Sequence, residues 1–199
     1  RSWSRRQFVS GSLGLLSMGS VLARSKAIMN PEPSIIQDIC IFSKHLQWLD
    51  FAQMAETAAA LGFDGVDLTV RPGGHVPPEK VTSLLPAAVK AVKAAGLRVP
   101  MMATGITESS DPLTEKILAT AAEHGVRHYR LGYYHYSDTE DPVKSLTHIR
   151  SKLAGLAKLN EKYRITGAYQ NHAGKNYFGA SIWDLWAAMK DLDPRWIGS

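Results

Sequence analysis

The 199-residue sequence predicts an α/β protein, a partial (β/α)8 barrel of about five and a half βα units. Short apolar runs alternate with longer segments whose apolar residues have helical spacing. Between these segments one sequence pattern recurs, in which a predicted helix ends, a glycine follows and an apolar strand begins. The glycines of this pattern are Gly62, Gly96 and Gly125. These glycines stand about 30 residues apart, the length of one strand, one helix and two short loops. Repetition at this spacing indicates parallel strands joined by helices.

The individual elements follow from the repeat. The predicted strands are 39–42, 65–69, 99–103, 128–132 and 166–170. The predicted helices are 50–61, 79–95, 112–124, 142–162 and 180–190. Two of these helices should begin at Pro112 and Pro142, because an aspartate precedes each proline and can cap the first turn. A sixth unit begins at residues 194–198.

Parallel βα units can form either a doubly wound sheet or a barrel. No Gly-x-Gly-x-x-Gly loop follows the first strand, where the sequence reads Ser43-Lys44-His45, so a dinucleotide-binding fold is disfavoured. A complete barrel of eight units needs about 250 residues. We therefore expect residues 28–199 to be the N-terminal portion of a longer barrel.

The first 27 residues have the composition of an export signal. They include five basic side chains and no acidic one, and Ser4-Arg5-Arg6-Gln7-Phe8-Val9 leads into an apolar run that ends at Ala23. Paired arginines in this pattern are typical of the bacterial twin-arginine signal. We therefore expect export to the periplasm through the twin-arginine machinery. The apolar run, about 15 residues long, is too short for a stable membrane span.

Charge in the rest of the chain is balanced. The whole sequence has a net charge of +5, but residues 28–199 carry 18 basic and 18 acidic side chains. The zero net charge of residues 28–199 disfavours nucleic acid as a partner. The single cysteine, Cys40, excludes an intrachain disulfide.

Polar side chains gather at the predicted carboxyl ends of the strands, where (β/α)8 barrels carry their working residues. His45 and Asp67 are the candidates for acid–base catalysis. The candidates for substrate binding are Arg71, His75, Tyr134, Asn171 and His172. Amides, imidazoles and phenols exchange hydrogen bonds with hydroxyl groups, and aromatic rings cover the apolar face of a sugar. The sequence therefore predicts a small-molecule carbohydrate as the ligand.

Two further expectations concern this set of residues. Tyr133 and Tyr134 should point in opposite directions, because neighbours on an extended segment alternate. Arg71 is almost alone among basic residues at the strand ends, so a phosphorylated sugar is not expected.

The sequence resembles the xylose isomerase-like TIM barrel family, which comprises sugar phosphate isomerases and epimerases and related abasic-site endonucleases. The resemblance covers about residues 35–199 and rests on Gly65-Val66-Asp67-Leu68, on the segment 71–76 and on the segment 167–172. It implies a divalent metal (Mn, Mg, Zn or Co) at the barrel mouth, which assists proton or hydride transfer on a sugar. The implied ligands are a carboxylate from strand five and residues from strands six to eight.

Gln170 departs from this pattern, because the family usually has Glu before Asn-His. An amide oxygen binds hard cations more weakly than a carboxylate, and an amide cannot act as a general base. Gln170 is therefore a weakened metal ligand, a hydrogen-bonding partner of the substrate, or a sign that metal is absent. The first functional hypothesis is an exported sugar isomerase or epimerase, and the second is a non-catalytic carbohydrate-binding barrel. Cleavage of DNA at abasic sites is disfavoured by the zero net charge of residues 28–199 and by the export signal.

Overall fold

The computed structural model describes residues 38–199. The strands are β1 (Cys40–Phe42), β2 (Gly65–Val70), β3 (Met101–Thr104), β4 (His128–Arg130), β5 (Thr166–Ala168) and β6 (Ile197–Gly198). The helices are α2 (Phe51–Ala60), α3 (Val81–Ala94), α4 (Pro112–Glu123), α5 (Pro142–Tyr163) and α6 (Ile182–Met189), with short 3-10 helices η1 (Ser43–Leu46) and η2 (Pro78–Lys80). The predicted export signal, residues 1–27, lies outside the described residues.

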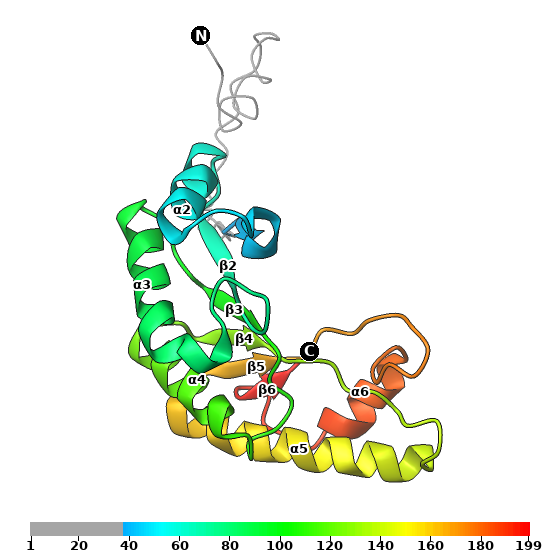
Figure 1. The fold of residues 1–199 in the computed structure, drawn as a ribbon. Coiled ribbons are helices and arrows are strands. Elements are labelled where there is room, and N and C mark those ends of the chain that lie inside the picture. The colour runs from blue at the N-terminus through cyan, green and yellow to red at the C-terminus, as the bar shows by residue number, and fades with distance from the viewer. Residues whose placement is uncertain (1–37) are drawn as a thin grey trace, which may run out of the picture. The chain divides into compact units, whose positions relative to one another are not determined.

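The strands form one parallel sheet in the order β1-β2-β3-β4-β5-β6 (Figure 1). Every connection between neighbouring strands contains one α-helix. A sheet that follows chain order in this way is part of a (β/α)8 barrel, whereas the strand order of a doubly wound sheet reverses at a switch point. The predicted fold class is therefore confirmed, and the ends of the ten predicted elements differ from the observed ends by at most two residues.

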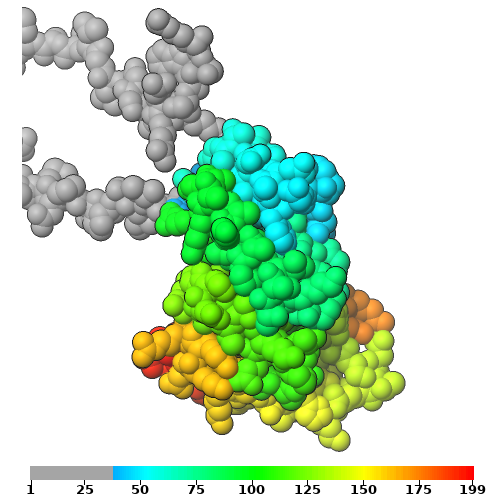
Figure 2. Space-filling view, turned by 60° about the vertical axis from the view of Figure 1, so that its left-hand side comes forward, coloured from blue at the N-terminus to red at the C-terminus, as the bar shows by residue number. Residues whose placement is uncertain are grey.

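The helices cover one side of the sheet, and each helix from α2 to α5 contacts the next one in the chain. Figure 2 shows this helical side, where the surface passes from cyan through green to yellow in chain order. None of the helices within residues 38–199 combines the length and apolar character needed to cross a bilayer.

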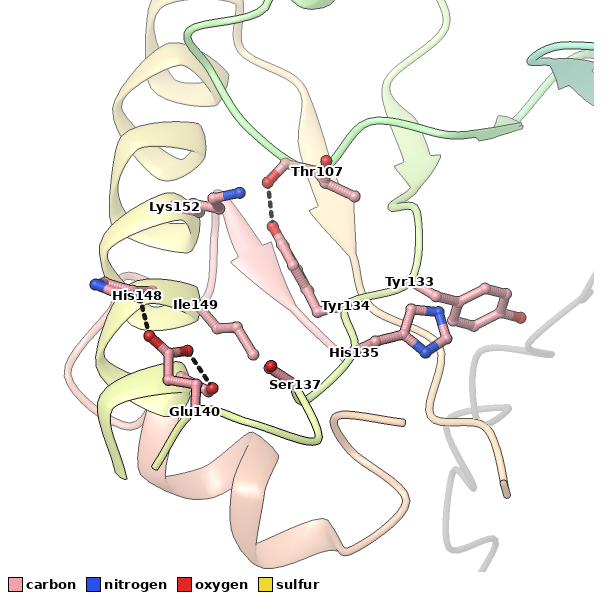
Figure 3. Close-up of a pocket in the computed structure, with 10 residues that line it drawn as sticks. Thr107, Tyr133, Tyr134, His135, Ser137, Glu140, His148, Ile149 and Lys152 are labelled. Carbon is pink, nitrogen blue, oxygen red and sulfur yellow. Dashed lines mark hydrogen bonds and ion pairs between the residues drawn. The ribbon is translucent and has the colours of Figure 1, made fainter. Parts of the chain in front are cut away.

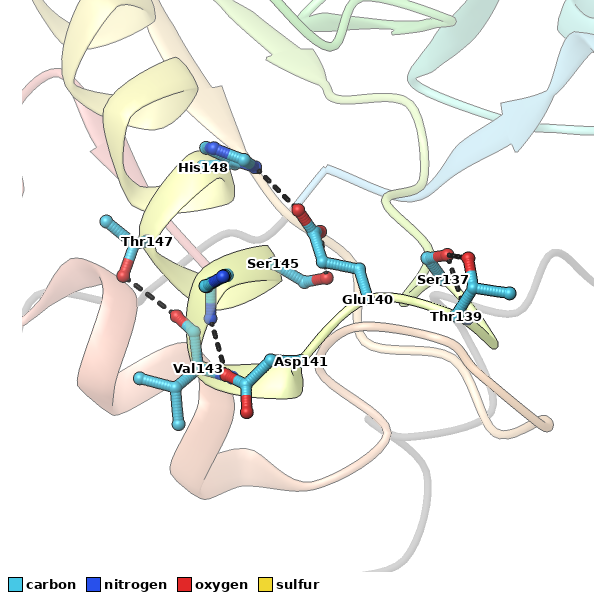
Figure 4. Close-up of polar contacts among 9 residues, drawn as sticks. Ser137, Thr139, Glu140, Asp141, Val143, Ser145, Thr147 and His148 are labelled. Carbon is cyan, nitrogen blue, oxygen red and sulfur yellow. Dashed lines mark hydrogen bonds and ion pairs between the residues drawn. The ribbon is translucent and has the colours of Figure 1, made fainter.

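The predicted helix caps are present. The Asp111 carboxylate accepts a hydrogen bond from the Leu113 amide at 2.8 Å, at the start of α4. Asp141 likewise accepts hydrogen bonds from the amides of Val143 and Lys144, at 2.9 and 3.1 Å, at the start of α5 (Figure 4). These bonds satisfy amides that have no partner within the helix. The aspartate before each proline thus caps the first turn of its helix, as the sequence predicts.

The core lies between the sheet and the helices. On β2, the side chains of Val66, Leu68 and Val70 are fully buried on the helical side. The buried Tyr129 of β4 donates its hydroxyl proton to Asn160 of α5 at 3.0 Å. Side chains at alternate positions of a strand point to the opposite face. Asp67 on β2 and Arg130 on β4 consequently face the inner side of the sheet, away from the helices.

Candidate functional site

The inner side of the sheet carries a cavity of about 550 Å³. Strands β1 to β5 each contribute one lining residue, namely Phe42, Asp67, Met101, Arg130 and Ala168. The rest of the lining follows β5 or ends the chain, and consists of Tyr169, Gln170, Asn171 and Ser199. Ligand pockets for small molecules have volumes of about 300 to 1,000 Å³, so this space is large enough for a sugar.

Gln170 is held by a hydrogen-bond network that joins the ends of β4 and β5. Arg130 Nη1 donates to Gln170 Oε1 at 2.6 Å and contacts the Tyr133 hydroxyl at 3.0 Å. The Tyr133 hydroxyl donates in turn to Gln170 Oε1 at 3.1 Å. Both lone pairs of the amide oxygen are therefore engaged, and the amide nitrogen keeps its donors for another partner.

Asp67 is the acidic side chain of the cavity wall. Burial raises the pKa of Asp67 from 3.8 to about 6, and the nearby guanidinium groups of Arg130 and Arg71 limit this rise. Its Oδ1 atom is buried and has no hydrogen-bond partner among the described residues. A carboxyl group with a pKa near the working pH can both take up and release a proton. Asp67 therefore has the burial, location and pKa of an acid–base group.

Aromatic rings surround the charged groups. The Arg71 and Arg130 guanidinium carbons lie 5.6 and 6.0 Å from the centroid of the Phe42 ring. His45 packs edge-on against the same ring, with centroids 6.0 Å apart, and is exposed. His172 is also exposed, and its ring lies 5.4 Å from that of Tyr133. The predicted residues Asp67, Gln170 and Asn171 thus line one cavity. Arg71 lies beside it at the Phe42 ring, and His45 and His172 are exposed near the aromatic rings of the site.

Tyr134 is separated from this cavity. Tyr133 and Tyr134 point in different directions, as expected (Figure 3). The Tyr133 hydroxyl is the one that reaches Gln170. Tyr134 is 6% exposed, and its hydroxyl donates to the Thr107 carbonyl at 2.5 Å. It lines a different cavity of about 280 Å³ beside α5, where Glu140 contacts Ser145 and His148 (Figure 4). The structure therefore places Tyr134 in the core. Tyr133, and not Tyr134, lies beside Gln170, where Tyr134 was predicted to bind the substrate.

His75 is also outside the main cavity. The loop after β2 folds back so that Val76 pairs with Val70, and the His75 amide donates to Thr69 Oγ1 at 2.9 Å. The His75 imidazole, whose pKa is lowered by burial, lines a separate cavity of about 320 Å³ with Asp50 and other residues near the start of α2. This turn carries the side chain away from Gln170.

Arg130 and Phe42 are central to the site, although neither is among the residues predicted for it. Both lie inside strands, whereas most of the predicted residues lie in the loops after the strands. The alternation of side chains along β4 could have identified Arg130. Neighbouring side chains on a strand point to opposite faces, so if the large aromatic ring of Tyr129 packs against the helices, Arg130 faces the barrel interior.

Gln170 does not fit the role of a metal ligand in this structure. Its amide oxygen already accepts two hydrogen bonds, and one donor is a guanidinium group at 2.6 Å, which would repel a divalent cation. Within residues 38–199, no three His, Cys, Asp or Glu side chains form a group that could hold a metal ion. We therefore assign no chemical step of this chain to a metal at Gln170.

Several solved structures share the fold. The 3-keto-D-glucoside 4-epimerase YcjR from E. coli has a TM-score of 0.63 and 13% identity, with 81% of this chain and 68% of that chain covered. The D-psicose 3-epimerase from Clostridium cellulolyticum H10, determined with D-tagatose, has a TM-score of 0.62 and 14% identity, with 81% and 62% covered. A xylose isomerase-like TIM barrel protein from Mycobacterium smegmatis, in complex with magnesium, has a TM-score of 0.54 and 14% identity, with 81% and 63% covered.

The chain spans about three-fifths to two-thirds of the length of these proteins, and at such identities the likeness establishes the fold alone. No curated protein matches the sequence. Residues 55–199 match the model of the xylose isomerase-like TIM barrel family. This match covers well over half of the sequence. The chain therefore belongs to the xylose isomerase-like TIM barrel family.

Proposed function

We propose that the protein is an isomerase or epimerase that moves a proton on a sugar or sugar derivative. The observation that carries this proposal is that Asp67, a carboxyl group with a pKa of about 6, and Arg130 line the wall of one sugar-sized cavity. The epimerases among the structures of the same fold support the choice of substrate class. The export pattern of residues 4–9 supports a periplasmic location as part of the same proposal.

The chemistry that we assign to these residues is a proton transfer next to a carbonyl group. The ionised Asp67 carboxylate removes a proton from the carbon beside the sugar carbonyl, and the electron pair moves onto the carbonyl oxygen. The Arg130 guanidinium stabilises the negative charge that grows on this oxygen. Return of the proton from Asp67 to the former carbonyl carbon gives the isomer, when the hydroxyl proton of the neighbouring carbon moves to the former carbonyl oxygen. Delivery of a proton from solvent to the opposite face of the original carbon gives the epimer, and Asp67 then releases the proton that it removed to solvent. Gln170 and Asn171 hold the sugar hydroxyl groups.

Metal-assisted transfer, which the family resemblance implies, is not part of this proposal. The Arg130 guanidinium occupies the Gln170 oxygen, which stands at the implied ligand position of strand five. Arg130 supplies the positive charge at the carbonyl oxygen in the mechanism assigned here.

The test is exchange of carbon-bound hydrogen with solvent. The full-length protein, incubated with a panel of aldoses and ketoses in deuterium oxide, should catalyse loss of the proton next to the carbonyl, followed by NMR. The value of kcat/KM should rise about tenfold per pH unit below pH 6 and level off above it, because Asp67 acts as the base only when ionised. A rate independent of pH between 4 and 8 would contradict the assignment of Asp67.

A non-catalytic carbohydrate-binding barrel is the second candidate. It is favoured by the full engagement of the Gln170 oxygen at a position where the family usually has a carboxylate. Sugar binding without any hydrogen exchange would support this candidate and exclude the enzyme. Absence of both binding and exchange would contradict both functions.

A further inference from the structure

Thr69 is a fully buried polar residue that the proposed mechanism does not use. It lies two positions after Asp67 on β2, so both side chains point to the inner side of the sheet. Thr69 Oγ1 accepts a hydrogen bond from the His75 amide at 2.9 Å, and it lies 3.1 Å from Ser43 Oγ. The Thr69 amide donates in turn to Ser43 Oγ at 2.9 Å. Thr69 thus joins three segments of the chain, namely η1, β2 and the loop after β2.

These hydrogen bonds fix the turn that begins with Arg71. The Thr69 carbonyl accepts a hydrogen bond from the Val76 amide at 3.0 Å, so both the carbonyl and the hydroxyl group of Thr69 hold the returning chain. Between these contacts the Gly74 amide donates to the Arg71 carbonyl at 2.8 Å, which closes a tight turn. A Cβ atom at Gly74 would lie only 3.0 Å from the Thr69 carbonyl oxygen. The turn is therefore packed directly against Thr69.

The turn places the Arg71 guanidinium group close to Asp67. Phe42 of β1 is in register with Asp67 of β2, so their side chains lie side by side on the inner side of the sheet. The Arg71 guanidinium carbon lies 5.6 Å from the centroid of the Phe42 ring. At this position the positive charge of Arg71 helps to lower the pKa of Asp67.

Further charged or titratable groups surround this pair. They are the Arg130 guanidinium of β4, the Cys40 thiol of β1 and the exposed His45 imidazole of η1, which packs against the Phe42 ring. None of these three groups belongs to the turn after β2. Release of the turn therefore changes the charge near Asp67 through Arg71.

We propose that Thr69 is a positioning residue, which holds Arg71 beside Phe42 and Asp67 by fixing the turn 71–76. This inference rests on the proposed function, since it assigns a role at the same cavity. His75 then serves the site by anchoring the turn to Thr69, and not through the predicted contact of its ring with the substrate.

The test is the titration midpoint of the Asp67 carboxyl group, measured by ¹³C NMR on the full-length protein. Thr69→Val keeps the shape of the side chain but cannot accept the hydrogen bond from the His75 amide, so the turn should loosen and Arg71 should move away. The midpoint should rise from about 6 to about 6.5 or higher, because a nearby positive charge lowers the pKa of a carboxyl group. Thr69→Ser keeps the hydroxyl group and should keep the midpoint.

A double-mutant cycle separates positioning from a merely structural role. Arg71→Met should raise the midpoint by itself. Thr69→Val should add nothing to this rise in the Arg71→Met protein, because Thr69 acts through Arg71. Thr120→Val is the matched control, since it removes a buried hydroxyl group that donates to the Lys116 carbonyl within α4, and it should leave the midpoint unchanged.

A second variant covers the case in which Thr69→Val does not fold. Gly74→Ala pushes the same turn away from Thr69 by steric contact and should also raise the midpoint. A wild-type midpoint in the folded variant, or an equal rise with and without Arg71, would overturn the inference and leave the proposed function standing. Hydrogen exchange by the wild-type protein that is independent of pH would contradict the proposed role of Asp67 itself.

Discussion

Replacing Asp67 by asparagine in the full-length protein should lower kcat by about 10²–10⁴-fold, the usual contribution of a general acid–base group. The amide keeps the size of the side chain and its place in the cavity wall, but it cannot take up a proton. Sugar binding should therefore persist while hydrogen exchange with solvent is lost. Asp64→Asn is the matched control, because Asp64 lies just before β2 at its amino end and bonds to the Ile39 amide. Its kcat should stay within about twofold of the wild-type value.

The same substitution should stabilise the folded protein at pH 8. The folded-state pKa of Asp67 lies above its unfolded value, so stability falls as pH rises from about 4 to about 6 and stays reduced above this window. The asparagine side chain carries no charge at any pH, and Asp67→Asn should therefore raise the free energy of unfolding at pH 8 by about 1–3 kcal/mol. At pH 3.5 the gain should fall to a few tenths of a kcal/mol, because Asp67 is then mostly protonated in both states. Denaturant unfolding at the two pH values measures the difference, and an equal gain at both would contradict the buried carboxylate.

Replacing Arg130 by methionine should lower kcat by about 10²–10³-fold, the effect of removing one charge-stabilising donor from an active site. Arg130 also lowers the pKa of Asp67, so its loss should move the midpoint of the pH profile of kcat/KM above 6. Arg130→Lys keeps the charge and should restore part of kcat together with the original midpoint. A purely structural role would lower stability and leave the midpoint in place.

Arg127→Met is the control for this series, since Arg127 is exposed and precedes β4 by one residue. It should leave both kcat and the midpoint unchanged. An Arg130→Met protein with wild-type kcat would remove Arg130 from the mechanism.

The fold could be predicted because its determinants are local. Asp111 and Asp141 cap their helices through amides two or three residues away. Gly62 and Gly125 follow the ends of α2 and α4 with φ angles of 82° and 83°. This is a left-handed conformation that glycine adopts at low cost. Capping and turn formation depend on a few neighbouring residues, so both can be identified from the sequence.

The site was predictable only in part, because its contacts join distant segments. Asp67 and Gln170 follow from their positions on a strand and just after one, and the structure brings them to one cavity. The bond from Arg130 to Gln170 spans 40 residues, and no sequence pattern shows that a strand arginine donates to this oxygen. His75 is turned away by a loop that pairs with its own strand, a contact that depends on the exact path of six residues.

The pKa of the Asp67 carboxyl group is the most direct test of the central claim, that Asp67 is a partly buried acid–base group in a sugar-sized cavity. It can be measured by NMR titration of the full-length protein labelled with ¹³C at the aspartate carboxyl carbons, with the Asp67→Asn variant to assign the signal. Because burial raises the pKa of Asp67 to about 6, we expect a midpoint of about 6. A midpoint near 4 would show an ordinary solvated carboxylate and contradict the account.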